Sequence, residues 1–288
     1  MIGIIGGSGL YQLDGLTDTH WEAIASPFGA PSDELLFGQM DGQPIVFLPR
    51  HGRGHKLSPS DINYRANIDV LKRVGVTDIL SVSAVGSLKE HLKPGTFVIV
   101  DQYIDRTILR ERSFFGKGCV AHVSMAHPTC SRLSGHIYRA AQKLGIDAVL
   151  GGTYLAMEGP QFSTLAESGM YRSLNCDVIG MTNIPEAKLA REAEMCYTSV
   201  AMVTDYDCWH PDHDNVTTQQ IIETLGANTA KARALVKEII PGFHADSAAA
   251  TCACRFALDN AIITPPDDRD PEMVLRLDAI ARRIFKNS

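Results

Sequence analysis

Residues 202–209 read Met-Val-Thr-Asp-Tyr-Asp-Cys-Trp and follow the apolar residues Val200 and Ala201. The apolar run predicts the end of a buried β-strand, and Asp205 and Asp207 come where that strand ends. Two residues apart in a strand, their side chains lie on one face. Buried carboxylates are costly unless they meet a partner. The stretch therefore predicts a core strand that brings two acids to a ligand with hydrogen-bond donors.

Strand and helix patterns alternate on both sides of this stretch. They predict an α/β fold, a mixed, largely parallel twisted sheet flanked by helices. No linker-like composition and no internal repeat divides residues 1–288, so we expect a single domain. Residues 241–288 are expected to form a less regular C-terminal extension with a final helix at about 272–285. The expected strands are 2–5, 44–48, 78–82, 97–100, 153–157, 178–182 and 197–205, and the other expected helices are 61–74, with Asp61 as its N-cap, 130–144, 164–174, 185–194 and 217–239.

Composition narrows the class of ligand. The chain has 288 residues, of which 45% are hydrophobic, so a sizeable core can form. A net charge of −6 without any basic run argues against nucleic acid or a membrane surface as partner. No apolar run approaches the roughly 20 residues that span a bilayer, and the start of the chain lacks the basic segment of a signal peptide. We expect a soluble, cytoplasmic protein that binds a small molecule.

The seven cysteines include one close pair, Cys252 and Cys254. Zinc sites usually have wider spacing and a second pair of ligands, and the sequence shows no second pair. A redox or disulfide role and simple burial both stay open for this pair. The His and Asp residues between 210 and 214 are close enough to bind a metal, although a solvated loop is the favoured interpretation. We expect no metal.

Small or polar residues follow several expected strands, where ligands of α/β sheets bind. The loop Gly6-Gly7-Ser8-Gly9 can hold an anion with its amides and the Ser8 hydroxyl, a tight turn being the alternative. Arg50, beside His51, offers a planar fork suited to phosphate, or is an ordinary surface arginine. Ser83 and Ser87 flank a glycine and form either an anion niche or a turn. Together these residues indicate a bound anion, whereas no Gly-x-Ser-x-Gly motif supports a serine hydrolase.

Six motifs occur in order and make the pattern specific. The array resembles the purine nucleoside phosphorylase superfamily over residues 2–240, and within it the members that act on 5′-methylthioadenosine. The resemblance implies cleavage of the N-glycosidic bond by inorganic phosphate, which is a co-substrate, with no metal or organic cofactor. The products would be adenine and 5-methylthioribose 1-phosphate. The motifs are Gly6-Gly7-Ser8-Gly9-Leu10, Pro49-Arg50-His51-Gly52, Asn63-Tyr64-Arg65-Ala66-Asn67, Glu158-Gly159-Pro160-Gln161-Phe162, Gly180-Met181-Thr182 with Pro185-Glu186, and Thr204-Asp205-Tyr206-Asp207-Cys208-Trp209.

The resemblance also assigns roles to individual residues. Phosphate would be held by Ser8, Arg50, His51, Ser83, Ala84 and Thr182. The nucleoside would contact Phe162, Met181, Asp205, Asp207, Thr218, Ile221 and Ile222. Ser163 and Thr218 would set specificity, at the base edge and at the 5′ pocket. His122 matches a residue that a neighbouring subunit lends to this pocket, which implies a homo-oligomer, a trimer or a dimer of trimers.

Asp205 and Asp207 are the expected catalytic residues. The purine leaves with developing negative charge, so a protonated Asp205 that donates to N7 would speed its departure. The same carboxyl can accept from the 6-amino group of adenine, whereas an asparagine would better suit a 6-oxopurine. The alternatives are a phosphorylase for 6-oxopurine nucleosides or methylthioinosine, a hydrolytic nucleosidase, and a non-catalytic purine-binding protein. A helix cap or buried ion pair is the structural alternative for Asp205.

Overall fold

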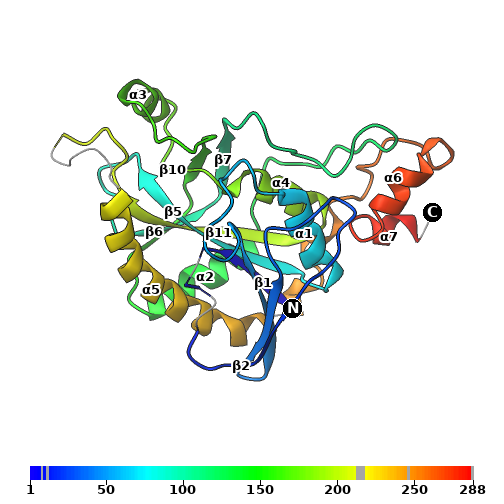
Figure 1. Ribbon diagram of the computed structural model, residues 1–288, viewed down its shortest axis with the longest axis horizontal. Helices are drawn as coiled ribbons and strands as arrows, with labels where there is room; N and C mark the ends of the chain where they lie inside the picture. The colour runs from blue at the N-terminus through cyan, green and yellow to red at the C-terminus, as the bar shows by residue number, and fades with distance from the viewer. Residues whose placement is uncertain (8, 11–12, 212–217, 245–246, 287–288) are drawn as a thin grey trace.

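A mixed β-sheet lies between two layers of helices in the computed structural model, which describes residues 1–7, 9–10, 13–211, 218–244 and 247–286. Figure 1 shows the strands β5 and β11 running through the middle of the molecule. The strands are β1 (Ile2–Gly6), β2 (Leu16–Glu22), β3 (Leu35–Met40), β4 (Gln43–Pro49), β5 (Asp78–Ser87), β6 (Phe97–Val100), β7 (Gln102–Asp105), β8 (Ala148–Leu150), β9 (Thr153–Ala156), β10 (Val178–Gly180) and β11 (Cys196–Asp205).

The sheet is mixed and mostly parallel, as the alternation of strands and helices predicts. Parallel pairs join β1 to β4 and β5, β11 to β5, β6 to β8, and β9 to β7 and β10. The antiparallel pairs are β2 with β3, β3 with β4, β10 with β5, and β11 with β6. Strands β2, β3, β7 and β8 were not predicted. Strands β2, β7 and β8 are partly exposed edge strands, whereas β3 lies between β2 and β4 and its apolar run, Leu35–Phe37, is only three residues long.

Strand β5 changes partners along one of its edges. On that edge, residues Asp78–Ser81 pair with β1, and Gly86 and Ser87 pair with β10. On the other edge β5 pairs with β11 from Asp78 to Gly86. Residues 82–85 of β5 therefore have no strand partner on the first edge within the described sheet. We call this opening the β5 fork, and the polar residues that follow the strands gather around it.

Side chains of the central strands alternate between two buried clusters, as the two-residue period of a strand requires. In β11, Tyr197, Ala201 and Val203 belong to one cluster, and Val200 and Met202 belong to the other. The first cluster packs under α1 (Tyr64–Arg73) and α4 (Asn183–Glu192). The second packs under α2 (Ser131–Lys143) and α5 (Thr218–His244). Both faces of the sheet are thus covered, which explains why its strands read as apolar runs.

The helices differ from the expected ones at their ends. Helix α1 begins at Tyr64 with Asn63 as N-cap, so the expected cap at Asp61 is wrong. The Asn63 side chain accepts from the Ala66 N–H, while Asp61 accepts from Ser58 instead. Helix α5 continues through Pro241 to His244, beyond its expected end. Helix α3 (Leu165–Ser173) begins with a capping box formed by Thr164 and Glu167.

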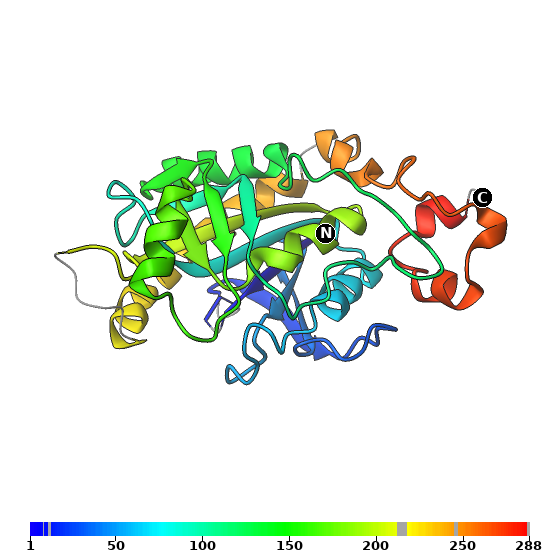
Figure 2. The same cartoon turned by 90° about the horizontal axis from the view of Figure 1, so that it is seen from above.

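The C-terminal extension folds back on the first cluster. Its expected single helix at about 272–285 is two short helices, α6 (Pro271–Arg276) and α7 (Arg282–Phe285). Between these helices, residues 277–280 form turns, and Leu277, Ile280 and Ala281 are buried in the first cluster. Figure 2 shows the segment of residues 105–125 running out to meet this extension. Within the described residues, no helix has both the length and the apolar character needed to span a membrane.

Candidate active site

The site assembles at the carboxyl ends of β1, β4, β5 and β11, around the β5 fork. Strand β4 ends at Pro49 and delivers Arg50 and His51, while β11 ends at Asp205. The N-terminus of α4 approaches the same place with Thr182 as its N-cap. The expectation that ligand-binding residues collect at strand ends therefore holds for the geometry of this sheet.

Arg50 lies inside the protein, with only 2% of its surface exposed. Its Nε donates to Glu186 Oε1 at 2.5 Å, and its Nη2 donates to Ser81 Oγ at 2.6 Å. Its Nη1 donates to the Val82 carbonyl at 2.9 Å, at the β5 fork. This ion pair fixes the end of β4 against β5 and α4. Arg50 thus supports the expected phosphate site from beneath, and direct contact with phosphate stays a prediction.

His51 is half-buried beside Arg50. Its Nδ1 lies 2.9 Å from the Leu57 carbonyl, and its ring stacks on His55 with centroids 4.3 Å apart. Burial, followed by the nearby positive charge of Arg50, lowers the pKa of His51 to about 4. The ring is therefore neutral near pH 7 in the free protein. Because the Leu57 carbonyl only accepts, Nδ1 carries the proton and Nε2 is left as an acceptor.

Buried hydroxyl and amide groups line the fork. Ser83 is 7% exposed and Thr182 is 6% exposed. The Ser83 hydroxyl donates to Asn183 Oδ1 at 3.4 Å, and the Ser199 hydroxyl donates to the same oxygen at 2.7 Å. Ala84 is half-buried beside them on β5. The structure therefore brings Ser83, Ala84 and Thr182 together, as a shared anion site requires.

Asp205 and Asp207 lie together, although the strand does not bring them to one face. Strand β11 shifts register between Val203 and Asp205 and then stops, and Asp207 adopts a left-handed conformation with φ of 52°. The expected strand alternation is therefore wrong beyond Asp205. A turn joins them instead, and the Asp207 N–H donates to Asp205 Oδ1 at 2.8 Å.

The environment of Asp205 favours its neutral form. Its Oδ2 accepts from the Thr204 hydroxyl at 2.6 Å. Burial raises the pKa of Asp205 and outweighs that hydrogen bond and the one from Asp207. Burial likewise raises the pKa of Asp207, which is 8% exposed. Neither carboxylate forms an ion pair within the described residues, so the structural alternative of a buried salt bridge finds no support.

Phe162, Met181 and Ser163, which are expected to contact the nucleoside, are half-buried or exposed. Phe162 is 48% exposed, and Met181 is half-buried against Gly159. Ser163 is half-buried, and its carbonyl accepts from the Cys208 thiol at 3.4 Å, next to Asp207. A Cβ on Gly180 would lie 2.1 Å from the Tyr154 hydroxyl. Tyr154 therefore requires glycine at position 180, and its hydroxyl accepts from the Thr182 N–H at 3.3 Å.

Three supporting residues carry no predicted role. Glu186, although part of a quoted motif, neutralises Arg50. Tyr154 sits under Gly180. Arg110 is 6% exposed and donates to the Met181 carbonyl at 2.5 Å and the Glu158 carbonyl at 2.9 Å, which ties the 158–163 segment to residue 181. Only their partners far along the chain reveal these roles, so no local sequence signal points to them.

The remaining predicted residues are not placed in this pocket. Ser8 lies outside the described residues, and so do the side chains of Thr218, Ile221 and Ile222 at the start of α5. His122 is exposed, and its N–H donates to the Ala261 carbonyl of the C-terminal extension at 2.9 Å. Of the residues between 210 and 214 that were considered as metal ligands, His210 has its Nε2 atom 3.1 Å from Glu90 Oε1. Residues 212–214 lie outside the described residues.

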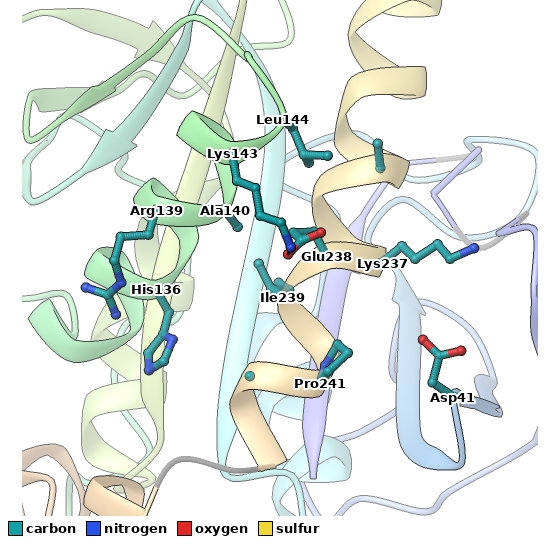
Figure 3. Close-up of a pocket in the computed structure, with 12 residues that line it drawn as sticks. Asp41, His136, Arg139, Ala140, Lys143, Leu144, Lys237, Glu238, Ile239 and Pro241 are labelled. Atoms are coloured by element: carbon teal, nitrogen blue, oxygen red, sulfur yellow. Dashed lines mark hydrogen bonds and ion pairs between the residues drawn. The ribbon is translucent and has the colours of Figure 1, made fainter.

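Away from these residues, a hollow of about 620 Å³ opens between α2 and α5. Figure 3 shows His136, Arg139 and Lys143 on α2, with Lys143 pointing to Glu238 of α5, while Lys237 of α5 points to the other side, toward Asp41. None of the predicted site residues lines this hollow. Its chemistry is that of a charged groove between two surface helices, and it is separate from the strand ends.

Comparisons with known proteins agree with this geometry. The model of the phosphorylase superfamily matches residues 1–241. A protein of Cereibacter sphaeroides named S-methyl-5′-thioadenosine phosphorylase is 59% identical over 99% of this chain and 99% of its own. A crystal structure of a methylthioadenosine phosphorylase from an antarctic soil metagenomic library has a TM-score of 0.92 and 46% identity, covering 97% of this chain and 98% of that one.

A further structure extends the comparison to a bound nucleoside. It is a variant of the adenosine/methylthioadenosine phosphorylase of Schistosoma mansoni in complex with methylthioadenosine. Its TM-score is 0.83 at 34% identity, with 93% of this chain and 98% of that chain covered. These likenesses confirm the predicted fold class.

Proposed function

The chain belongs to the phosphorylase superfamily, and we propose that it catalyses the phosphorolysis of S-methyl-5′-thioadenosine. Inorganic phosphate attacks the sugar C1′, and the products are adenine and 5-methylthioribose 1-phosphate. The names of the relatives at up to 60% identity support this substrate. The observation that carries the proposal is the half-buried carboxyl of Asp205 at the strand end beside the β5 fork, whose pKa is raised by desolvation.

Asp205 serves as the proton donor and base reader. Thr204 and the Asp207 N–H each use one lone pair of its oxygens and fix the plane of the carboxyl. In its neutral form the carboxyl donates to N7, where negative charge develops as the base leaves. Its remaining lone pairs accept from the 6-amino group of adenine. Asp207 contributes through its backbone, so it positions Asp205.

The fork holds phosphate on the other side of the sugar. Ser83 and Thr182 present hydroxyl donors beside the start of α4. Arg50 places a buried guanidinium, paired with Glu186, beneath this place. When phosphate binds, its charge raises the pKa of the neighbouring His51, and a protonated Nε2 then donates to it. Phosphate next to C1′ stabilises the cationic character that the sugar gains. The reaction uses no organic cofactor.

The proposed enzyme is a homo-oligomer that completes each pocket with a neighbour's histidine. His122 is exposed in its own chain, on a segment held to the C-terminal extension. Such a position suits a residue that reaches into another subunit, and a trimer or a dimer of trimers would allow it.

One assay tests the proposal. The protein is incubated with methylthioadenosine and with methylthioinosine, each with and without phosphate, and the release of free base is followed. We expect adenine release that requires phosphate. Release without phosphate would identify a nucleosidase, preferential release of hypoxanthine would identify a 6-oxopurine enzyme, and no release from any nucleoside would favour a binding protein.

A further inference from the structure

Four cysteines from three distant parts of the chain meet at one point. Their sulfur atoms all lie within 4.8 Å of one another. The Sγ atoms of Cys130 and Cys252 are 3.6 Å apart, too far for a disulfide bond and close for two thiols. The second ligand pair that the sequence does not show next to Cys252 and Cys254 is therefore supplied by the fold, as Cys130 and Cys196.

The arrangement matches the ligand shell of a tetrahedral metal ion. Zinc bound by four thiolates at about 2.3 Å places the sulfurs about 3.8 Å from one another. The four sulfurs already lie near this spacing, so only small side-chain movements are needed to close around an ion. An arrangement selected only for packing has no need to gather four sulfurs, since a free cysteine packs like any small apolar residue.

The surroundings can stabilise thiolates. Cys130 is the N-cap of α2, where the helix dipole favours negative charge. Nearby, the single carboxylate of Asp78 is shared by Arg132 and Arg255.

The cluster is far from the proposed active site. Cys196 is the first residue of β11 and Asp205 is the last. A strand of this length separates its ends by roughly 30 Å. The cysteines also join elements that the strand order alone leaves separate. They are the N-terminus of α2 with Cys130, the start of β11 with Cys196, and the segment around η2 (Ala253–Phe256) with Cys252 and Cys254.

We propose that Cys130, Cys196, Cys252 and Cys254 bind one Zn²⁺ ion as four thiolates. Binding releases up to four protons, one from each thiol, and changes no oxidation state. The ion has no open position for substrate, so its role is structural. It fastens the C-terminal extension, which also holds the His122 segment through Ala261, to the sheet and to α2.

The first test uses the unaltered chain. The protein is reduced, freed of metal with a chelator and titrated with Co²⁺ and then with Zn²⁺. We expect one equivalent of Co²⁺ to give the thiolate charge-transfer and intense visible bands of a tetrahedral site, and Zn²⁺ to abolish them. We also expect a higher Tm with metal. Absence of these bands, or binding too weak to compete with a chromophoric chelator, would overturn the proposal.

The second test measures metal content and thiol state in the protein as purified. We expect one zinc per chain, lost in Cys252→Ser and kept in Cys176→Ser, since Cys176 is buried outside the cluster. A protein mass lower by two hydrogens for each pair of these cysteines would show that they form disulfides, which would contradict zinc binding. Finding iron instead of zinc in the cluster would contradict it as well. Phosphorolysis assays report on the other end of the sheet, so failure of this proposal leaves the proposed activity standing.

Discussion

Arg50 and Glu186 form an ion pair in which both side chains are almost completely buried and the two charged atoms are 2.5 Å apart. They lie 136 residues apart in the sequence. The pair joins the end of β4 to α4 beside the β5 fork, where we propose that phosphate binds.

Replacing Glu186 by glutamine is expected to destabilise the protein strongly. The change leaves the Arg50 charge buried without compensation, which costs about 3–5 kcal/mol. Urea unfolding measures the loss. The matched control is Lys143→Met in the exposed pair with Glu238, where we expect at most about 1 kcal/mol. Equal losses in the two variants would show that burial does not govern the Arg50 pair.

Asp205→Asn is expected to lower the turnover of methylthioadenosine about 10²- to 10⁴-fold, because an amide cannot deliver a proton to N7. Asp207→Asn should lose much less, since Asp207 holds Asp205 through its backbone N–H and asparagine tolerates its positive φ. Steady-state kinetics with both variants measures the difference. Unchanged turnover in Asp205→Asn would remove this residue from the mechanism.

The activity should also fall at high pH. Burial raises the pKa of Asp205, and the neutral form donates, so turnover is highest below that pKa and declines as the pH rises through it. A pH profile of kcat for the unaltered protein records this limb. The limb should disappear from the residual activity of Asp205→Asn, and its persistence there would assign it to another group.

Glu192 provides a pH-dependent contribution to stability. Burial raises the pKa of Glu192 from 4.5 to about 7, against hydrogen bonds from the Phe114 N–H and the Ser113 hydroxyl. The neutral form is therefore favoured in the folded state, and its contribution, present below pH 4.5, is lost as the pH rises through 7.

Glutamine at this position stays neutral at every pH. Relative to the unaltered protein, Glu192→Gln should gain about 3 kcal/mol in the free energy of unfolding between pH 4.5 and 8. Urea unfolding at the two pH values measures this difference. The exposed Glu272→Gln serves as control and should show no such gain. A pH-independent difference for Glu192→Gln would mean that this carboxyl is already ionised in the fold.

Gly180→Ala should disturb the phosphate side of the site. The added methyl group would meet the Tyr154 hydroxyl at 2.1 Å, and overpacking of this kind costs about 1–3 kcal/mol. The Tyr154 hydroxyl also accepts from the N–H of Thr182, a proposed phosphate ligand. Displacing Tyr154 should therefore shift Thr182 and raise KM for phosphate. Gly169→Ala in α3, which meets nothing within 4 Å, should be neutral or stabilising. A Gly180→Ala protein with normal stability and KM would contradict the close packing.

A mixing experiment tests the shared pocket. His122→Ala chains and Asp205→Asn chains are each expected to be weakly active alone. Unfolding and refolding the two together produces mixed oligomers in which an intact His122 meets an intact Asp205. We expect activity to recover above the sum of the separate proteins. If light scattering confirms that mixed oligomers form but activity does not recover, His122 lies outside the pocket.

The local pattern of the chain was sufficient for much of this protein. Continuous apolar runs predicted β1, β4, β6, β9 and β11 within one or two residues, because each is buried on both faces, whereas β5 continues five residues beyond its expected end at 82. Strand β2 was missed because it is an exposed edge strand without that pattern, and β3 was missed because Gly38 and Gln39 cut its apolar run to three residues. The final helix was predicted as one piece because Leu277, Ile280 and Ala281 keep helical spacing, whereas the structure has turns at 277–280 between two short helices.

The sequence by itself determined the α/β class, the strand ends that carry the site, and, through its ordered motifs, the kind of ligand expected there. Only the tertiary structure decided that Arg50 is neutralised by Glu186, that a turn joins Asp205 to Asp207, and that four cysteines meet. The physical reason is one of range. Periodicity and capping act between neighbours in the chain, whereas buried charges and thiols take their partners from segments that the path of the backbone brings together.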